Sequence, residues 1–555
     1  MTDFDATCRF SSLGPHDVGI SEFADSRLLG IGGVIKCVPS DFIVQEISKE
    51  KIISSHGELE NPNDTVVKAS RDEDDCYFQF TLHKTMIDTF EVISELSSAL
   101  NVPFSNFSVF GLKDSFAITT QEMTVYGVSK ERLEEVNEFD KFIISNIREA
   151  DAPQRPGQHY GNKFTIVVRD LKADDEHTQV AMKSLTENGF VNYLGMQRFG
   201  KGSSETELMG RLLLMQDYIT AVDALLRPPH EDERHVKELR AWNLAWEAWT
   251  HARDATTARN IMPKSKRQEC DVLDHLVFFG KKGLPLHEIC RKTVLSIPLQ
   301  KRMLMVHAYF GKIWNVMASE RLRMYGIDPV VGDLVYNDDV EDSTDVNDVE
   351  SSDTELEDFS WTWSSKTNTK VLSAQDIESK RYTRFDLILP FPAGDAAYPN
   401  NEMSNLYRMY LSYDLGVSQI HFIERSWHGN KLFLRPVYRH LFSKPEEFTW
   451  SIANIDKSCP EDMRTQPIHE DPVLGNMARK AAPLASFPNM EALKVLEMKF
   501  TLKSGQYATM MLRELIKNRA GMCLNCSEMH TASHSYQCKN GRRKRKHIRF
   551  DSDED

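Results

Sequence analysis

The pattern of apolar and polar positions divides the chain into a first part of mixed strands and helices and a mainly helical middle. Alternation with period two indicates strands, which we place at 33–37, 41–46, 77–82, 107–110, 117–126, 163–169 and 385–390. Asp88 followed by Glu91, with apolar residues at helical spacing behind them, predicts a helix start. Helical spacing also predicts helices at 129–136, 212–214, 221–226, 239–249 and 306–324.

The last patterned segment alternates apolar and polar residues from Leu496 to Lys503, turns at Ser504-Gly505 and continues with helical spacing over 507–517. Short helices between strands in this way indicate an α+β fold. Residues 1–28 are mixed and polar, and we interpret them as an N-terminal extension.

The formal net charge of −15 over 555 residues, taken as a total, argues against a polyanionic partner. The excess acid is confined to two segments, because 338–358 holds 11 acidic residues without Lys or Arg and 551–555 holds 4 more. These two segments account for the whole imbalance, and the rest of the chain has 67 basic and 67 acidic residues. A nucleic-acid partner is therefore not excluded, and we expect 338–358 to be disordered.

The compartment is indicated by what the composition lacks. No apolar stretch approaches the ~18 residues of a membrane-spanning helix, and the start of the chain lacks the basic and apolar regions of a signal peptide. Nine cysteines, an odd number at low density, are typical of free thiols in a reducing compartment. We expect an intracellular protein, nuclear or cytoplasmic, that binds no membrane.

The first motif with candidate chemistry is Phe110-Gly111-Leu112-Lys113-Asp114, followed by Ser115 and by Ala117 to Gln121. A strand ends at Gly111, where glycine permits a tight turn or a close approach to a ligand. Neighbouring side chains on extended backbone point to opposite faces, so Lys113 and Asp114 need not pair with each other. A solvated β-turn with two surface charges would give the same spacing.

The second motif is the segment 192–200, with the sequence Asn-Tyr-Leu-Gly-Met-Gln-Arg-Phe-Gly. Aromatic rings, amides and an arginine between two glycines suit a site that stacks a base and binds its edges. A buried junction between a strand and a loop is the alternative interpretation.

Together the two motifs resemble the TruD family of pseudouridine synthases, in its eukaryotic branch. That family carries a Gly-x-Lys-Asp segment with its catalytic aspartate, followed by an Asn-Tyr-x-Gly-x-Gln-Arg-Phe-Gly segment. Further stretches resemble it in the same order, at 19–23, 39–46, 159–164, 332–335 and 504–514. The resemblance spans residues 19–520.

The resemblance implies an α+β fold, in which a catalytic domain with a mixed sheet and flanking helices is split by an inserted, TruD-specific α/β domain. The implied segments are an extension at 1–28, catalytic domain at 29–205, insertion at 206–484, catalytic domain again at 485–520 and a flexible tail at 521–555. The insertion contains the acidic stretch 338–358.

The implied reaction detaches uracil from the ribose C1′, turns it and rejoins it through C5. It has no redox step, so we expect no cofactor. By the resemblance Asp114 is the catalytic residue, either as a nucleophile at the sugar or as a base toward the 2′ carbon. The implied substrate-binding residues are Phe42 as a pocket wall, Lys113 to hold Asp114 charged or meet a phosphate, Asn192 to orient the uridine, Leu194 and Arg198.

Two positions depart from the family pattern. Ser115 stands where the family usually has Arg or Lys, and Leu194 stands where it usually has Phe or Tyr. Leucine keeps apolar contact but loses base stacking, which contributes roughly 1–3 kcal/mol per base. The resemblance therefore leaves room for a slower enzyme.

The tail offers a rival signal, because Cys523, Cys526, His530 and Cys538 could ligate zinc. Their spacing misses the usual zinc-knuckle pattern, and loose thiols in a flexible tail are the alternative. The basic run 542–546 could be a nuclear import signal, a phosphate contact or a solvated tail.

The sequence thus predicts a monomeric RNA pseudouridine synthase. The implied substrate is tRNA, with uridine 13 as the family's target, and small nuclear and messenger RNA are further candidates. One rival hypothesis is an RNA-binding protein on the same fold that is weakly active or inactive. Another is a zinc-dependent tail that recruits a protein partner.

Overall fold

The structure is a computed structural model. It describes residues 14–49, 54, 76–136, 139, 141–154, 159–199, 206–228, 236–337, 368–392, 396–416, 426–427, 430–431, 437–455, 474, 477 and 493–517. The acidic stretch 338–358, the four zinc candidates and the basic run 542–546 lie outside these residues.

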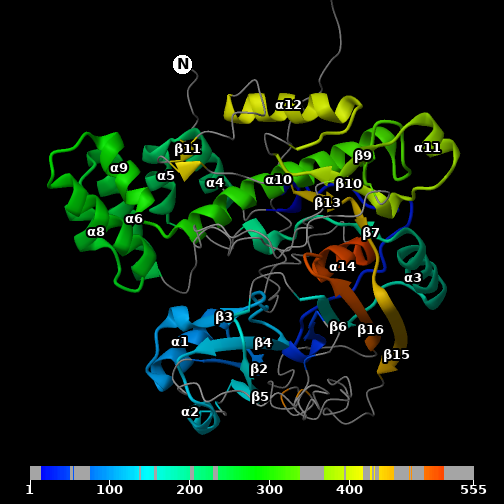
Figure 1. Ribbon diagram of the computed structural model, residues 1–555, viewed down its shortest axis with the longest axis horizontal. Helices are drawn as coiled ribbons and strands as arrows, with labels where there is room; N and C mark the ends of the chain where they lie inside the picture. The colour runs from blue at the N-terminus through cyan, green and yellow to red at the C-terminus, as the bar shows by residue number, and fades with distance from the viewer. Residues whose placement is uncertain are drawn as a thin grey trace, which may run out of the picture.

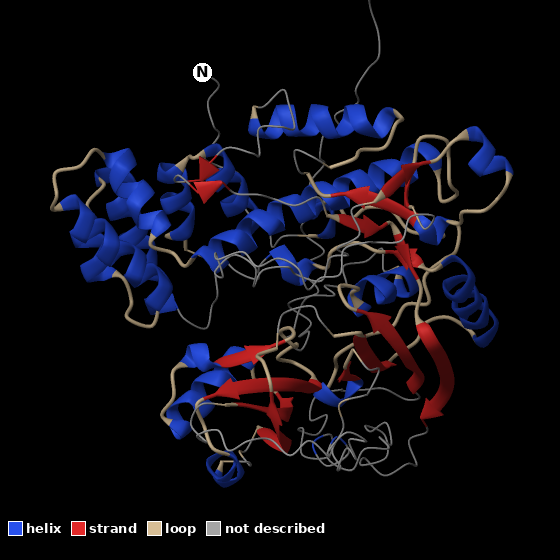
Figure 2. Cartoon of the chain, viewed as in Figure 1, coloured by secondary structure: helices blue, strands red, loops and turns tan. Residues whose placement is uncertain are grey.

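A large mixed sheet forms the half of the molecule that is opposite most of the helices (Figures 1 and 2). Its strand order is β15 (Glu446–Ile455), β16 (Leu493–Lys503), β6 (Gly161–Val168), β1 (Phe42–Ile47), β4 (Ile118–Tyr126), β2 (Tyr77–Thr85) and β5 (Phe142–Ala150). β3 (Phe107–Val109) also pairs with β4. β1 and β4 run parallel, whereas β4 is antiparallel to β2 and β1 is antiparallel to β6. The predicted α+β class with a mixed sheet is confirmed.

The predicted alternation is visible in β16, where Leu496, Met498, Phe500 and Leu502 are all buried. These side chains belong to the core that the sheet shares with α3 (Asp175–Asn188) and α14 (Ala508–Ile516). Two further helices, α1 (Thr89–Leu100) and α2 (Lys130–Glu135), also pack on this sheet. The predicted start of α1 is confirmed, because the Asp88 carboxylate accepts a hydrogen bond from the Phe90 amide at 2.8 Å.

Two strands of the large sheet were not predicted. β5 lies at one edge, and its pairing with β2 shifts register between Gln79 and Thr81. β15 lies at the other edge and pairs with β16 from Ile455↔Leu493 to Glu446↔Thr501. Because edge strands tolerate polar residues, neither segment alternates as clearly as β16. β15 falls inside the range 206–484 that the sequence assigns to the insertion, yet it belongs to the large sheet.

The second half is mainly helical and contains a small sheet. Its helices are α4 (Thr206–Met215), α5 (Tyr218–Leu225), α6 (Val236–Ala252), α7 (Ala255–Ile261), α8 (Arg267–Gly280), α9 (Leu286–Leu295), α10 (Leu299–Tyr325), α11 (Ala374–Glu378) and α12 (Glu402–Leu415). The small sheet has the order β13 (Tyr438–His440), β10 (Leu387–Pro390), β8 (Leu334–Tyr336) and β9 (Thr369–Val371). α10 runs from the group of α4 to α9 toward this sheet (Figure 1), where the indole nitrogen of Trp314 donates to the Leu389 carbonyl at 3.1 Å.

Two further sheets have two short strands each. β14 (Phe442–Ser443) pairs with β7 (Phe190–Val191), and β11 (Ser426–Trp427) pairs with β12 (Asn430–Lys431). Across the described ranges, no helix combines the length and the apolar character needed to cross a membrane.

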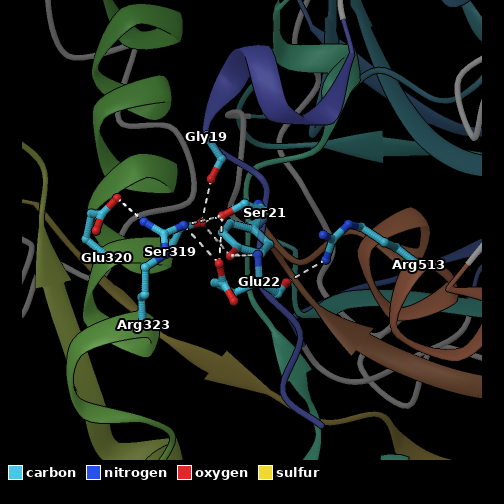
Figure 3. Close-up of polar contacts among 8 residues, drawn as sticks. Gly19, Ser21, Glu22, Ser319, Glu320, Arg323 and Arg513 are labelled. Atoms are coloured by element: carbon cyan, nitrogen blue, oxygen red, sulfur yellow. Dashed lines mark hydrogen bonds and ion pairs between the residues drawn. The ribbon is translucent and has the colours of Figure 1, made fainter. Parts of the chain in front are cut away.

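Residues 14–28, which we interpreted as part of an extension, lie inside the folded body between α10 and α14. Val18 and Ile20 are fully buried. Ser319 of α10 donates to the Gly19 carbonyl at 2.6 Å, and Arg513 of α14 donates to the Glu22 carbonyl at 2.7 Å (Figure 3). The segment therefore joins a helix of each half of the molecule.

A buried ion pair fixes the start of β1. Arg169 donates from Nε at 2.9 Å to each oxygen of Asp41 and from a terminal nitrogen at 2.6 Å to Oδ1. Asp41 Oδ2 also accepts from the amides of Cys37 and Val38 at 3.1 and 3.2 Å. Both side chains are buried, so either one alone would leave an uncompensated charge in the core.

We therefore expect Arg169→Leu to lower the free energy of unfolding by about 3–5 kcal/mol, because Asp41 would stay buried without its partner. Urea unfolding followed by circular dichroism measures the effect. The matched control is Lys172→Met, which removes an exposed pair with Asp170 and should cost below about 1 kcal/mol. Equal stability of the two variants would contradict a structural role for the buried pair.

Candidate active site

The site lies where the two parallel strands begin. Ile43 of β1 is opposite Ile118 of β4, and Ile118 is also opposite Thr85 at the end of β2. Three chain segments therefore meet at one end of these strands, namely the approach to β1, the end of β2 and the loop 110–117 that enters β4. Asp114 lies in this loop.

The Asp114 carboxylate is held by donors from three directions. The Lys36 ammonium forms an ion pair with Oδ2, and the Gln197 amide donates to the same oxygen at 3.1 Å. The amide of Phe116 donates to Oδ1 at 2.9 Å. The side chain of Asp114 is 8% exposed and that of Lys36 is 7% exposed. Because Gln197 belongs to the second sequence motif, its hydrogen bond brings the two motifs together.

Lys113 points away from this cluster, as the alternation of side chains on extended backbone leads one to expect. Its ammonium lies 2.7 Å from Glu46 Oε2 and 2.7 Å from the Asn162 side-chain oxygen. Burial raises the pKa of Glu46, and the Lys113 charge opposes this shift. Burial, together with the Lys113 charge, lowers the pKa of His159 to about 3. Lys113 therefore anchors the loop to β1 and β6, and Lys36 is the ammonium that pairs with Asp114.

The backbone of the loop is held by buried side chains of β2, α1 and β4. The Lys84 ammonium donates to the carbonyls of Ile87, Asp114 and Lys113 at 3.0, 2.9 and 3.4 Å. The Thr89 hydroxyl accepts from the Lys113 amide at 3.4 Å, and the Gln121 amide donates to the Gly111 carbonyl at 3.2 Å. Burial lowers the pKa of Lys84 to about 8, against the raising effect of Asp88 and Asp114.

Phe42, the predicted pocket wall, supports the ammonium of Lys36. Its ring centroid is 4.4 Å from Lys36 Nζ, and its edge packs on Phe164 at a centroid distance of 6.1 Å. Phe42 is 4% exposed. Lys36 itself has a φ of 55°, and Gly33 has a φ of 105°. These left-handed residues explain why the predicted strand at 33–37 is reduced to one bridge between Val34 and Arg169.

Asn192, predicted to orient the uridine, has both ends of its amide engaged by the protein. Its nitrogen donates to the His440 carbonyl at 3.1 Å, and its oxygen accepts from Arg439 at 2.7 Å. Arg439 also donates to the Asn192 carbonyl at 2.8 Å. Burial lowers the pKa of Arg439 to about 10, and the charge of Arg198 contributes to the shift. The second motif is therefore fastened to β13 by a buried guanidinium.

Leu194 and Arg198 occupy different environments. Leu194 is 1% exposed, and its backbone amide and carbonyl bond to the Asn315 side chain of α10 at 2.9 and 3.1 Å. Its side chain is so close to α10 that a Cβ atom added at Gly311 would lie 3.1 Å from Leu194 Cδ2. Arg198, in the short helix η4 (Met196–Phe199), is half-buried. Its charge adds to the burial that lowers the pKa of His307 to about 4.

Sequence reasoning missed Lys36, Lys84 and Gln197. Gln197 stood within the second motif, but the spacing of that motif does not show which of its side chains faces Asp114. Lys36 and Lys84 lie in strand-like stretches far from either motif, and only the order of strands in the sheet brings them to the loop. Within the described ranges, no three His, Cys, Asp or Glu residues are grouped so that they could hold a metal ion.

Comparison with known proteins agrees with this architecture. The sequence model of the family described as tRNA pseudouridine synthase D (TruD) matches residues 17–373. The mouse protein "Pseudouridylate synthase 7 homolog" is 29% identical over 444 residues, which cover 80% of this chain and 59% of the relative. The fission yeast protein "Multisubstrate pseudouridine synthase 7" is 29% identical over 450 residues, covering 80% and 62%. The chain thus spans about three fifths of the length of these curated relatives.

A crystal structure of a putative tRNA pseudouridine synthase D from Methanosarcina mazei has the same fold. It superposes with a TM-score of 0.55 at 19% identity, covering 91% of this chain and 97% of that one.

The position of Leu194 yields a stability prediction. We expect Leu194→Phe to destabilise the protein by about 1–3 kcal/mol, because the larger ring would overpack against Gly311 of α10. Leu194→Met, which nearly conserves volume, is the matched control and should cost below about 1.5 kcal/mol. Urea unfolding measures both. A phenylalanine variant as stable as the wild type would show that this side chain faces an open space instead of the core.

Proposed function

The chain belongs to the TruD family, and from this we propose that it is an RNA pseudouridine synthase that isomerises uridine in tRNA. The single observation that supports this proposal best is the Asp114 carboxylate. It is nearly buried, it pairs with Lys36, and it is oriented by Gln197 and the Phe116 amide. The relatives' names supply the reaction, and this carboxylate is the group that could perform it.

The reaction breaks the bond between uracil N1 and ribose C1′ and forms a bond between C5 and C1′, while C5 loses its proton and N1 gains one. In one route Asp114 bonds to C1′ and is displaced when C5 attacks that carbon. In the other route it removes the proton of the 2′ carbon and later returns it. Both routes need an ionised carboxylate in a fixed direction. Lys36 compensates the negative charge, and the donors on Oδ1 and Oδ2 orient the group before a nucleotide arrives.

The target nucleotide must leave its base stack to meet a carboxylate at this depth. Extrusion of a base costs a few kcal/mol, which contacts to the flipped base must offset. Gln197 is exposed and donates a hydrogen bond to Asp114, and the half-buried Arg198 follows it in the same short helix. We propose that the segment 196–199 contacts the flipped uridine or its phosphate, and that Asn192 acts behind it by holding the motif on β13.

The substrate class we propose first is tRNA, with uridine 13 as the position, because the matching family is described by tRNA. The fission yeast relative is named multisubstrate. Small nuclear and messenger RNA are therefore proposed as further substrates and belong in the same assay. We propose that the protein acts on each as a monomer.

The test is Asp114→Asn, which keeps the shape of the side chain and removes its charge. We expect turnover on tRNA to fall by more than about 1000-fold, because no other group replaces the reacting carboxylate. The dissociation constant for the same RNA should change by less than about threefold, since phosphate contacts dominate affinity. Pseudouridine mapping and filter binding measure the two quantities.

The matched control is Asp271→Ala, at an exposed aspartate of α8, which should retain full turnover. Retained pseudouridine formation in folded Asp114→Asn would refute the assignment of Asp114. RNA binding by a wild-type protein that forms no pseudouridine would favour the rival hypothesis of a non-catalytic RNA-binding protein.

A further inference from the structure

Lys84 is a fully buried lysine that binds backbone carbonyls. It lies at the end of β2 and none of its side chain is exposed. Its ammonium donates to the carbonyls of Ile87, Asp114 and Lys113. Among the described residues, no carboxylate lies within ion-pair distance of this ammonium. Burying a charge without such a partner is costly, and here the hydrogen bonds to the three carbonyl oxygens offset that cost.

Two of these carbonyls, those of Lys113 and Asp114, belong to the loop 110–117. The loop leaves the hydrogen-bond ladder between β3 and β4, and its partly buried carbonyl groups require other donors. The Lys84 ammonium is the donor for two of them, at Lys113 and Asp114, and its hydrogen bond to the Ile87 carbonyl ties the loop to the segment that follows β2. A methionine would fill the same volume without a charge, but it would leave all three carbonyls without this donor.

We propose that Lys84 is a positioning residue for Asp114, because its ammonium binds the carbonyl of the peptide on each side of the Asp114 Cα and thereby sets the direction of the Asp114 carboxylate. The inference rests on the proposed function, since the direction of this side chain matters only if Asp114 reacts. Lys36 and Lys84 then have different roles. Lys36 pairs with the carboxylate, and Lys84 holds the backbone from which the carboxylate extends.

The protonation of Lys84 gives this role a pH signature. The charged groups that act on it are Asp88 at the start of α1 and Asp114 and Lys113 in the loop. Burial lowers its pKa to about 8, so the side chain is a protonated ammonium with three N–H groups below that pH. As the pH rises through about 8, the group loses one N–H and its charge, so the three carbonyls of Ile87, Lys113 and Asp114 share two N–H donors where they had three.

The first experiment measures the loop without relying on activity. Hydrogen exchange on the full chain should show the Lys113 and Phe116 amides exchanging at least tenfold faster in Lys84→Met than in the wild type. Lys183→Met, at an exposed lysine of α3, is the matched control and should leave the loop unchanged. Unchanged protection of these amides in folded Lys84→Met would overturn the proposal.

The second experiment measures single-turnover pseudouridine formation on tRNA. Lys84→Met should lower the rate roughly 10- to 100-fold, as expected for a misplaced reacting group, with the dissociation constant for RNA changed less than about twofold. The wild-type rate should fall as the pH rises through about 8. Lys84→Gln, which cannot titrate, should lose this alkaline decline, whereas any ionisation of the uridine affects both enzymes alike.

A wild-type rate in Lys84→Met, or an unchanged alkaline decline in Lys84→Gln, would refute the positioning role. If Lys84→Met does not fold, Lys84→Gln decides both the exchange and the pH measurement. If the wild type forms no pseudouridine, the proposed function fails, while the exchange experiment still decides whether Lys84 holds the loop.

Discussion

A loop that leaves a β-sheet must find new partners for its buried backbone groups, and the candidate site depends on how residues 110–117 meet this requirement. Regular pairing ends at Val109 and resumes at Ile118. In between, the donors and acceptors come from buried side chains of neighbouring elements, namely Lys84, Thr89 and Gln121. Lys113 adds a side-chain anchor to Glu46. The loop is thus fixed from several sides, and the carboxylate of Asp114 is the part left to face Lys36 and Gln197.

Charge in this region is balanced locally, and the net charge of the chain gives no guide to it. Each of three buried carboxylates has a cation of its own: Asp114 has Lys36, Glu46 has Lys113, and Asp41 has Arg169. Such pairs contribute little net stability when intact. Breaking one is costly, because it leaves an uncompensated charge in the core, and this restricts which arrangements of the surrounding backbone are tolerated.

The sequence predicted well those features that depend on near neighbours. The alternation in β4 and β16 and the Asp88 cap are local patterns, and the two motifs identified Asp114 and the segment that contains Gln197. Features that depend on distant pairing were missed. Lys36 is 78 positions from Asp114 and joins it only because β1 and β4 are parallel neighbours. Leu194 matches a family position by motif, but its environment is set by α10, more than 100 residues later.

The segment at residues 14–28 has a consequence for how the chain is made. The Ala24 and Asp25 amides donate to the Glu514 carboxylate, across 490 and 489 positions of sequence, and the Glu22 amide donates to the Tyr193 hydroxyl at 3.1 Å. These bonds to α14 cannot form until residue 514 has been synthesised, so Ala24 and Asp25 must wait for the 490 and 489 positions that separate them from it. β16 arrives equally late and supplies a strand beside β6. Closures of this length are slow, and a nascent chain interrupted before α14 would expose the apolar surface that Val18 and Ile20 otherwise cover, which is the kind of surface that chaperones bind.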